Sequence, residues 1–137
     1  ALTALYDLIA PHARSAGLGY VLWSPADISL GEDEVLQPDL FAYRTATARP
    51  LRDWGDIEAL LLVIEVSSPS TARCDRTLKR RRYQRARVPE YWVVDLDARL
   101  IERWRPDDER PEILSERIEW TGLAINLAAL FAEIHGE

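Results

Sequence analysis

The chain of 137 residues has few of the residues on which several protein classes depend. Its single cysteine, Cys74, excludes an internal disulfide framework and a cysteine-based zinc site. The two histidines, His12 and His135, lie near opposite ends of the sequence, so neither a histidine metal cluster nor a histidine-based triad is expected. The sequence has no uncharged apolar run of about eighteen residues, which excludes a transmembrane helix. It also has no glycine-rich nucleotide-binding loop.

Methionine is absent and the chain begins at Ala1, so we expect a trimmed product that lacks an upstream segment. A lone thiol and the absence of a signal-peptide pattern favour a reducing, cytoplasmic setting. With 47% hydrophobic residues, the length fits a single domain over residues 1–137 with its own core.

Charge is distributed unevenly along the chain. The net charge of -6 argues against a protein that coats nucleic acid nonspecifically. The segment Arg73–Arg87, however, holds eight basic residues and one acid, which leaves -13 on the rest of the chain. This segment fits a local contact with phosphates, and it fits equally well a solvated helix face paired with the surplus acids.

Hydrophobic patterning predicts an α/β domain. Leu60–Val66 and Tyr91–Asp95 are apolar runs typical of strands buried on both faces. Between them, the serine-rich segment Ser67–Thr71 starts a helix that should run to about Arg85 and end before Pro89. This strand–helix–strand unit predicts a right-handed crossover between parallel strands.

The other predicted elements are two helices and several strands. They are helices at Leu2–Ala16 and Leu127–Ile134, and strands at Gly19–Ser24, Ile28–Leu30, Val35–Leu36, Leu40–Tyr43, Leu100–Arg105 and Ile113–Trp120. Alternating polarity predicts that Leu100–Arg105 is a half-exposed edge strand. Thr45–Asp56 is the best loop candidate, and Asn126 is placed to cap the last helix.

Glu65 is the most unusual position, because its carboxylate interrupts an apolar strand. An ionised carboxylate there costs roughly several kcal/mol unless a cation or hydrogen bonds compensate it. Asp39, in the string P-D-L-F-A-Y, and Lys79, on the following helix, are candidates for that environment. Two carboxylates and a main-chain carbonyl could hold a hard cation such as Mg²⁺. The simpler interpretations are a core arginine paired with Glu65 and a turn or cap role for Asp39.

The predicted helix offers further polar residues to the same region. Asp75, Lys79 and Tyr83 are spaced four residues apart and therefore share one face. Apolar residues on or beside this stripe indicate that it faces the sheet: Ala72, Leu78 and Ala86. The alternative is a surface ion pair between Asp75 and Lys79.

Four strings in the chain resemble the Uma-type family of putative restriction endonucleases, within the PD-(D/E)xK nuclease-like superfamily. They are Q-P-D-L-F-A-Y, L-L-V-I-E-V-S-S-P-S-T, C-D-R-T-L-K-R-R-R-Y and V-P-E-Y-W-V-V-D, and together they cover most of the chain. The resemblance implies a restriction-endonuclease-like mixed sheet flanked by helices. It also implies hydrolysis of DNA phosphodiester bonds that depends on Mg²⁺ or Mn²⁺.

The resemblance further implies roles for individual residues. Asp39 and Glu65 would be the two acids of the motif, with the carbonyl of Val66 as a third metal ligand. The superfamily's usual lysine position, two residues after the second acid, holds Ser67 here. Lys79 would replace that lysine from the next helix.

The helix would supply supporting and DNA-binding residues as well. Asp75 and Tyr83 would orient Lys79 or line the site. Exposed arginines would hold the DNA backbone without reading sequence: Arg73, Arg76, Arg80 and Arg81. A homodimer with two-fold symmetry is a further expectation, because two scissions of a duplex need two sites.

Two other functions stay open at this point. A Ser–Lys hydrolase would use Ser67 or Ser68 with Lys79, but it leaves Asp39 and Glu65 unexplained. A non-catalytic nucleic-acid-binding or assembly module on the same fold would fit the acidic body. The tryptophans could stack on bases, although a place in the core is the simpler interpretation: Trp23, Trp54, Trp92, Trp104 and Trp120.

Overall fold

The computed structural model describes residues 2–23, 28–31, 34–36, 38–45, 57–67 and 73–137. Six strands form the central sheet: β1 (Tyr20–Trp23), β4 (Leu40–Thr45), β5 (Ile57–Ser67), β6 (Tyr91–Asp95), β7 (Leu100–Trp104) and β8 (Glu112–Leu114). Two hairpins lie outside it: β2 (Ile28–Gly31) with β3 (Glu34–Leu36), and β9 (Arg117–Trp120) with β10 (Leu123–Asn126). The helices of the described part are α1 (Leu2–Ser15), α2 (Arg73–Arg85) and α3 (Leu127–Ile134).

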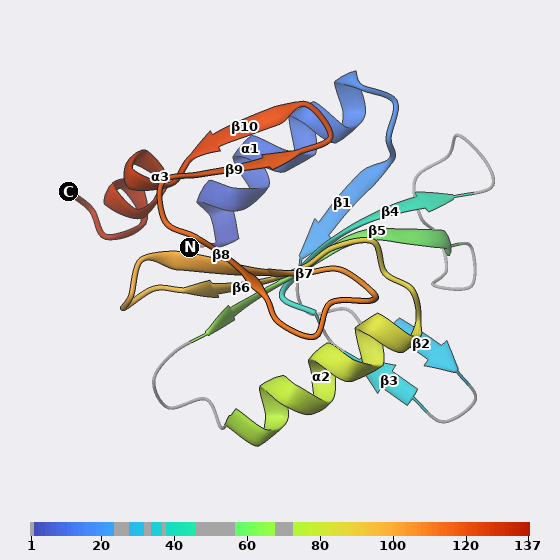
Figure 1. Cartoon of the computed structure of the whole chain (residues 1–137). Helices are drawn as coiled ribbons and strands as arrows, with labels where there is room; N and C mark the ends of the chain where they lie inside the picture. The colour runs from blue at the N-terminus through green and yellow to red at the C-terminus, as the bar shows by residue number, and fades with distance from the viewer. Residues whose placement is uncertain (1, 24–27, 32–33, 37, 46–56, 68–72) are drawn as a thin grey trace.

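The strand order in the central sheet is β1-β4-β5-β6-β7-β8, as Figure 1 allows the reader to follow. β5 and β6 are parallel, whereas the other neighbouring pairs are antiparallel. Helix α2 connects the parallel pair, as the sequence predicted. The predicted mixed sheet flanked by helices is therefore confirmed.

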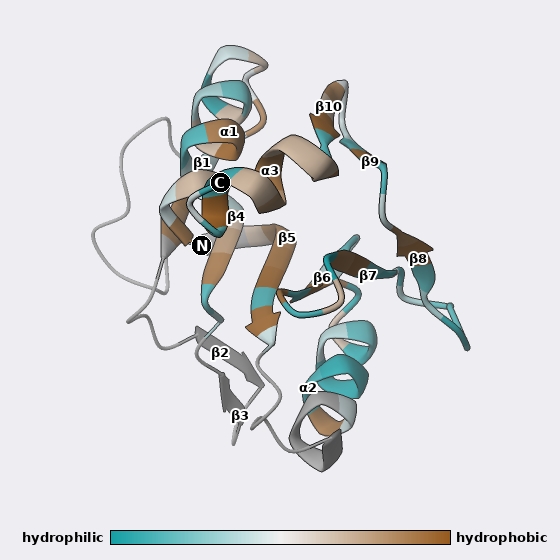
Figure 2. Cartoon of the chain, turned by 90° about the vertical axis from the view of Figure 1, so that its left-hand side faces the viewer, coloured by the Kyte–Doolittle hydropathy of each residue, from teal (hydrophilic) through white to brown (hydrophobic). Residues whose placement is uncertain are grey.

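Alternating side chains divide the interior into two cores, one on each face of the sheet. On one face, sheet residues such as Ile64 and Trp92 pack with α1, α3 and the β9–β10 hairpin. On the other face, Val63 and Val93 pack with Tyr83 of α2. Figure 2 shows that α2 is largely hydrophilic, so only a narrow strip of this helix contributes to the second core.

The structure corrects the prediction near the C-terminal end of the sheet. The expected strand Ile113–Trp120 is two strands, β8 and β9, and the sequence interpretation missed β10. Thr121 and Gly122 join β9 to β10 with φ values of 44° and 92°, the pair of positive angles that a tight hairpin turn of type I′ requires. Because β8 pairs with β7, the predicted edge strand at Leu100–Arg105 is not an edge.

Several smaller predictions are confirmed or refined. Asn126 caps α3, since its Oδ1 accepts a hydrogen bond of 3.0 Å from the Ala129 N–H. The central strand starts at Ile57, three residues earlier than the predicted Leu60. Gly19 has a φ of 152°, and a Cβ there would lie 2.1 Å from the Tyr43 carbonyl oxygen, so only glycine fits this approach to β4.

Other predictions lie wholly or largely outside the described residues. They include residues 46–56 of the predicted loop, the helix-start segment 68–71, Trp54 and the side chain of Trp23. Within the described helices, none combines the length and the hydropathy needed to cross a membrane.

Candidate active site

Asp39 immediately precedes β4, which is antiparallel to β5, the strand that holds Glu65. Leu40 pairs with Ile64, so continuing the register by one residue places Asp39 opposite Glu65. The Oδ2 atom of Asp39 accepts a hydrogen bond of 2.8 Å from the main-chain N–H of Val66. Directly opposed residues of an antiparallel pair have neighbouring Cβ atoms, so the two carboxylates approach each other on the α2 side of the sheet.

Helix α2 brings a cation and a hydroxyl group to the same carboxylate. The Nζ atom of Lys79 donates to Oε2 of Glu65 at 3.2 Å, and the hydroxyl of Tyr83 donates to Oε1 at 3.5 Å. Lys79 and Tyr83 are one turn apart and face the sheet together. Lys79 is the only lysine among the 17 basic residues of the chain.

Burial sets the electrostatics of this group. Glu65 is 9% exposed and Tyr83 is fully buried, whereas the Lys79 side chain keeps 27% of its surface exposed. Burial, followed by the negative charge of Glu65, raises the pKa of the Tyr83 hydroxyl far above its ordinary value, and the charge of Asp39 adds to the shift. Tyr83 is therefore a neutral hydrogen-bond donor at physiological pH.

The structure thus places the three predicted catalytic residues, Asp39, Glu65 and Lys79, in one region, together with Tyr83, which the sequence predicted on the same helix face. Val66 contributes through its N–H group, while its carbonyl as a metal ligand stays a prediction. Ser67 lies next to them at the end of β5 and is 8% exposed.

The inward stripe of α2 is narrower than the sequence predicted. Leu78 is 52% exposed and Ala86 is exposed, so neither packs on the sheet. Each residue turns an α-helix by about 100°, which directs Leu78 away from the sheet once Lys79 and Tyr83 face it. The side chains of Asp75, Arg73 and Arg76 lie outside the described part of the structure.

The two remaining predicted DNA-binding arginines have different surroundings. The guanidinium carbon of Arg80 lies 4.3 Å from the centre of the Trp104 ring, and its Nη1 donates to Gln84 Oε1 at 3.2 Å. Arg81 is exposed on the outer side of α2. Trp92 and Trp120 are buried in the core, as the simpler interpretation of the tryptophans predicted.

The oxygen ligands present fit a magnesium-type site with few protein ligands. Among the described residues, no group of three or more histidine, cysteine, aspartate or glutamate side chains is arranged to hold a metal. Mg²⁺ commonly uses one or two carboxylates together with water and substrate phosphates. Asp39 and Glu65 supply such a pair of hard oxygen ligands, with Lys79 sharing the second carboxylate.

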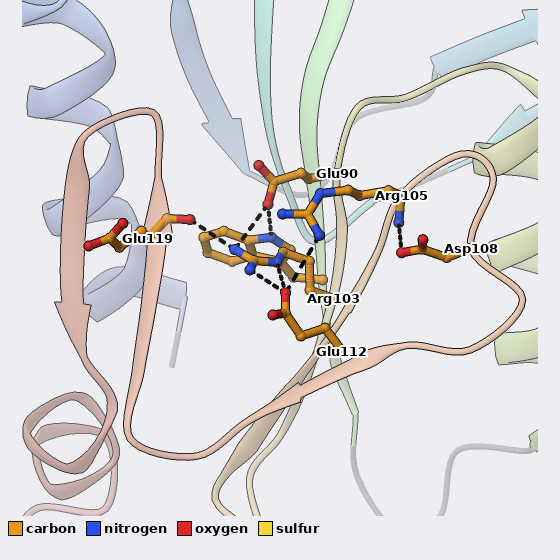
Figure 3. Close-up of polar contacts among 7 residues, drawn as sticks. Glu90, Arg103, Arg105, Asp108, Glu112 and Glu119 are labelled. Carbon is orange, nitrogen blue, oxygen red and sulfur yellow. Dashed lines mark hydrogen bonds and ion pairs between the residues drawn. The ribbon is translucent and has the colours of Figure 1, made fainter.

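A second buried ion cluster was missed by the sequence interpretation (Figure 3). Arg103 is 8% exposed, and its guanidinium contacts Glu112, the carbonyl oxygen of Glu119 at 3.0 Å and Glu90 at 3.6 Å. Glu90 also accepts a hydrogen bond of 3.0 Å from Trp92 Nε1. The available signal was the alternation in β7, which places Arg103 on the same face as the buried Ile101.

Comparison with known proteins supports the fold and places the chain in a family. A crystal structure of a putative nuclease belonging to DUF820 from Anabaena variabilis ATCC 29413 superposes with a TM-score of 0.69 at 15% identity. The match covers 96% of this chain and 75% of that chain, and at this identity it shows the shared fold. A search of curated proteins found no match. The model of the Uma2 family, described as "Putative restriction endonuclease", matches residues 1–132, so this chain belongs to the Uma2 family.

Proposed function

We propose that this protein is a metal-dependent endonuclease that hydrolyses phosphodiester bonds of DNA at Asp39, Glu65 and Lys79. One observation carries the proposal: Glu65, which lies opposite Asp39 in the continued β4–β5 register, contacts the single lysine of the chain at an Nζ–Oε2 distance of 3.2 Å. The nuclease-like fold and the family agree with this chemistry.

Each residue would have a separate task. A bound Mg²⁺ or Mn²⁺ ion supplies Lewis-acid chemistry, which neutralises phosphate charge and lowers the pKa of water. Asp39 and Glu65 would hold that ion, with the carbonyl of Val66 as a third ligand. Lys79 would stabilise the negative charge that develops on the phosphoryl oxygens.

Tyr83 and the hydrogen bond from Val66 would fix the two acids before substrate binds. The Tyr83 hydroxyl holds Oε1 of Glu65, and the Val66 N–H holds Oδ2 of Asp39. Preset carboxylates lose little conformational freedom when a ligand arrives. Asp75 would support Lys79 from the preceding turn of α2.

The choice of lysine rather than arginine at position 79 fits this task. The chain has 16 arginines, yet the basic residue that contacts Glu65 here is its one lysine. A lysine ammonium is a compact point charge, whereas a guanidinium is a wide planar fork. A compact cation can sit beside a carboxylate and still approach a phosphate.

The partner would be DNA, with Arg73, Arg76 and Arg81 contacting phosphates. The two-fold dimer and the cytoplasmic location stay predictions that accompany this function.

A plasmid-nicking assay tests the proposal. With millimolar Mg²⁺ or Mn²⁺, the full chain should convert supercoiled plasmid to the nicked form, and EDTA should stop the conversion. Glu65→Gln and Lys79→Ala should abolish nicking, whereas Glu133→Gln, an exposed acid on α3, should not. Ser67→Ala should also retain nicking activity. A Ser–Lys hydrolase that used Ser67 would lose its activity with this substitution, so the variant distinguishes the two mechanisms.

A negative result has a definite meaning. If the folded wild-type chain does not nick DNA with either metal, and if neither metal raises its melting temperature, the endonuclease proposal is wrong. The non-catalytic binding or assembly module then becomes the better account.

A further inference from the structure

A shallow groove lies on the outer side of α2, away from Glu65. It is lined by Leu78, Arg81, Gln84, Arg85, Arg87 and Pro106, and we refer to it as the α2 groove. Half of its lining residues are arginines. On the opposite side of the same helix, Lys79 and Tyr83 face the sheet.

The wall of the α2 groove opposite the helix is the loop between β7 and β8, and side chains of the helix region hold this loop in place. The Nε2 atom of Gln84 donates to the carbonyl oxygens of Arg105 at 2.9 Å and of Asp108 at 2.8 Å. Arg87 forms an ion pair of 2.8 Å with Asp107. The groove is therefore formed before any ligand binds.

Arg80 strengthens this arrangement from the inner side of the groove. It lies over Trp104, the last residue of β7, and donates to Gln84 Oε1. The resulting chain of contacts runs from the sheet through Arg80 and Gln84 to the loop. Arg80 thereby positions the groove wall, while Arg81 and Arg85 are exposed.

The charge of the α2 groove contrasts with that of the whole protein. Its lining includes three arginines and no acid, with Asp107 paired to Arg87 at the rim, on a chain of net charge -6. Local positive charge on an acidic body attracts a polyanion to that place and repels it elsewhere. Arginine forks suit phosphate oxygens spaced along a strand.

We infer that the α2 groove binds the phosphate backbone of the nucleic-acid strand on which the site acts, a few nucleotides from the phosphate to be cleaved. The inference rests on the proposed function in taking nucleic acid as the substrate. Lys79 and Arg85 are six residues apart, which is about 9 Å along a helix axis. One strand of a duplex rises about 3.4 Å per phosphate. A strand that lies along α2 can therefore contact Lys79 with one phosphate and Arg85 with another phosphate a few nucleotides away.

Salt-dependent binding of a labelled DNA duplex in EDTA tests the inference without cleavage. Fluorescence anisotropy of the full chain between about 50 and 200 mM KCl gives the slope of log affinity against log salt. Arg81→Ala and Arg85→Ala should each reduce this slope by about 0.9, so each substitution makes the fall in affinity across the salt range about threefold smaller. Arg14→Ala, an exposed arginine on α1 across the sheet, is the matched control and should leave the slope unchanged.

A gain-of-binding variant guards against misfolding as an explanation. Asp107→Asn removes the acid that pairs with Arg87 at the rim of the groove. It should bind the duplex several-fold more tightly at low salt, a result that a folding defect does not produce. A control, Asp97→Asn in the exposed β6–β7 turn, should bind as wild type does.

The outcomes separate this inference from the proposed function. If Arg81→Ala and Arg85→Ala bind with the slope of Arg14→Ala, or if the wild-type chain does not bind the duplex at all, the α2 groove is not a backbone site. Nicking by the wild type can persist in the first case, which leaves the endonuclease proposal standing. Conversely, altered slopes without any nicking and without a metal-induced rise in melting temperature support the groove and overturn the endonuclease.

Discussion

Two buried ion clusters lie on opposite faces of the same sheet, and they differ in how fully their partners enclose the charge. On one face, Arg103 contacts Glu90, Glu112 and a main-chain carbonyl. On the other face, Glu65 meets Lys79, which remains 27% exposed, and a tyrosine hydroxyl. A second acid, Asp39, faces the same place.

This difference separates a structural cluster from a candidate active site. The Arg103 guanidinium has partners on Nε, Nη1 and Nη2, and these partners reinforce the β7–β8 pair and join β9 to the central sheet. In the Glu65 cluster, the lysine keeps 27% of its side-chain surface exposed beside a pair of acids. Removing a charge should therefore affect stability in the first cluster and activity in the second.

The largest expected effect on stability is that of Arg103→Ala. Loss of the guanidinium leaves Glu90 and the Glu119 carbonyl without their cation or donor, which should lower the free energy of unfolding by about 3 to 5 kcal/mol. Urea unfolding measures this. Arg117→Ala removes an exposed pair with Glu119 on the same hairpin and should cost less than about 1 kcal/mol. Equal losses in the two variants would show that the Arg103 cluster contributes no more to the free energy of unfolding than an exposed ion pair does.

Lys79→Ala should show the opposite pattern. Loss of a charge that stabilises the transition state should reduce the rate of DNA nicking by about 10²- to 10³-fold. Because Lys79 is partly exposed and Glu65 keeps the Tyr83 hydroxyl as a partner, loss of Lys79 should lower the free energy of unfolding by about 1 to 3 kcal/mol, less than loss of Arg103. Single-turnover nicking and urea unfolding on the same preparation check both numbers. A large loss of stability with unchanged nicking would reverse the roles of the two clusters.

Tyr83→Phe should alter the alkaline limb of the stability curve. The pKa of Tyr83 is raised by folding, so the folded state keeps this proton at pH values where the unfolded chain has lost it. The free energy of unfolding of the wild type should therefore fall above about pH 10, and it should fall more steeply than that of Tyr83→Phe. The difference in slope should reach up to about 1.4 kcal/mol per pH unit. Urea unfolding from pH 9 to about pH 11 measures the difference, in which contributions of other tyrosines cancel. Parallel curves would contradict the burial of this hydroxyl beside Glu65.

The smallest expected effect belongs to Glu112→Gln in the Arg103 cluster. Hydrogen bonding to Arg103 lowers the pKa of Glu112, so its contribution to stability is present above the unfolded pKa near 4.3 and is lost as pH falls further. Because this side chain is 47% exposed, the contribution should be below about 1 kcal/mol. Thermal unfolding between neutral pH and about pH 3 should show a shallower acid limb in the variant than in the wild type. Identical acid limbs in the two proteins would indicate that the Glu112 carboxylate contributes nothing to the free energy of unfolding.

The candidate site was predictable from the sequence because its signals are local. Glu65 interrupts an apolar strand, and four-residue spacing places Lys79 and Tyr83 on one helix face. The error over Leu78 has the same origin: an apolar residue next to the stripe was assigned to it, although the turn of about 100° between neighbouring residues directs Leu78 away from the sheet.

The Arg103 cluster was not predictable in the same way. The alternation in β7 places the arginine on the face of Ile101, but its partners come from three other segments of the chain. Their convergence depends on β8, which covers the predicted edge, and on the hairpin that begins with β9. The Thr121–Gly122 turn was the one local sign of that hairpin.

The single lysine of the chain allows the most direct test of the central claim. Reductive methylation with ¹³C-formaldehyde labels Lys79 and the terminal amine only, and it keeps the ammonium charge. If Asp39, Glu65 and Lys79 surround one divalent ion, micromolar Mn²⁺ should broaden the Lys79 methyl resonance in the wild type and leave it sharp in the Asp39→Asn/Glu65→Gln variant. A Lys79 resonance that stays sharp in the wild type, or that broadens equally in both proteins, would contradict the account.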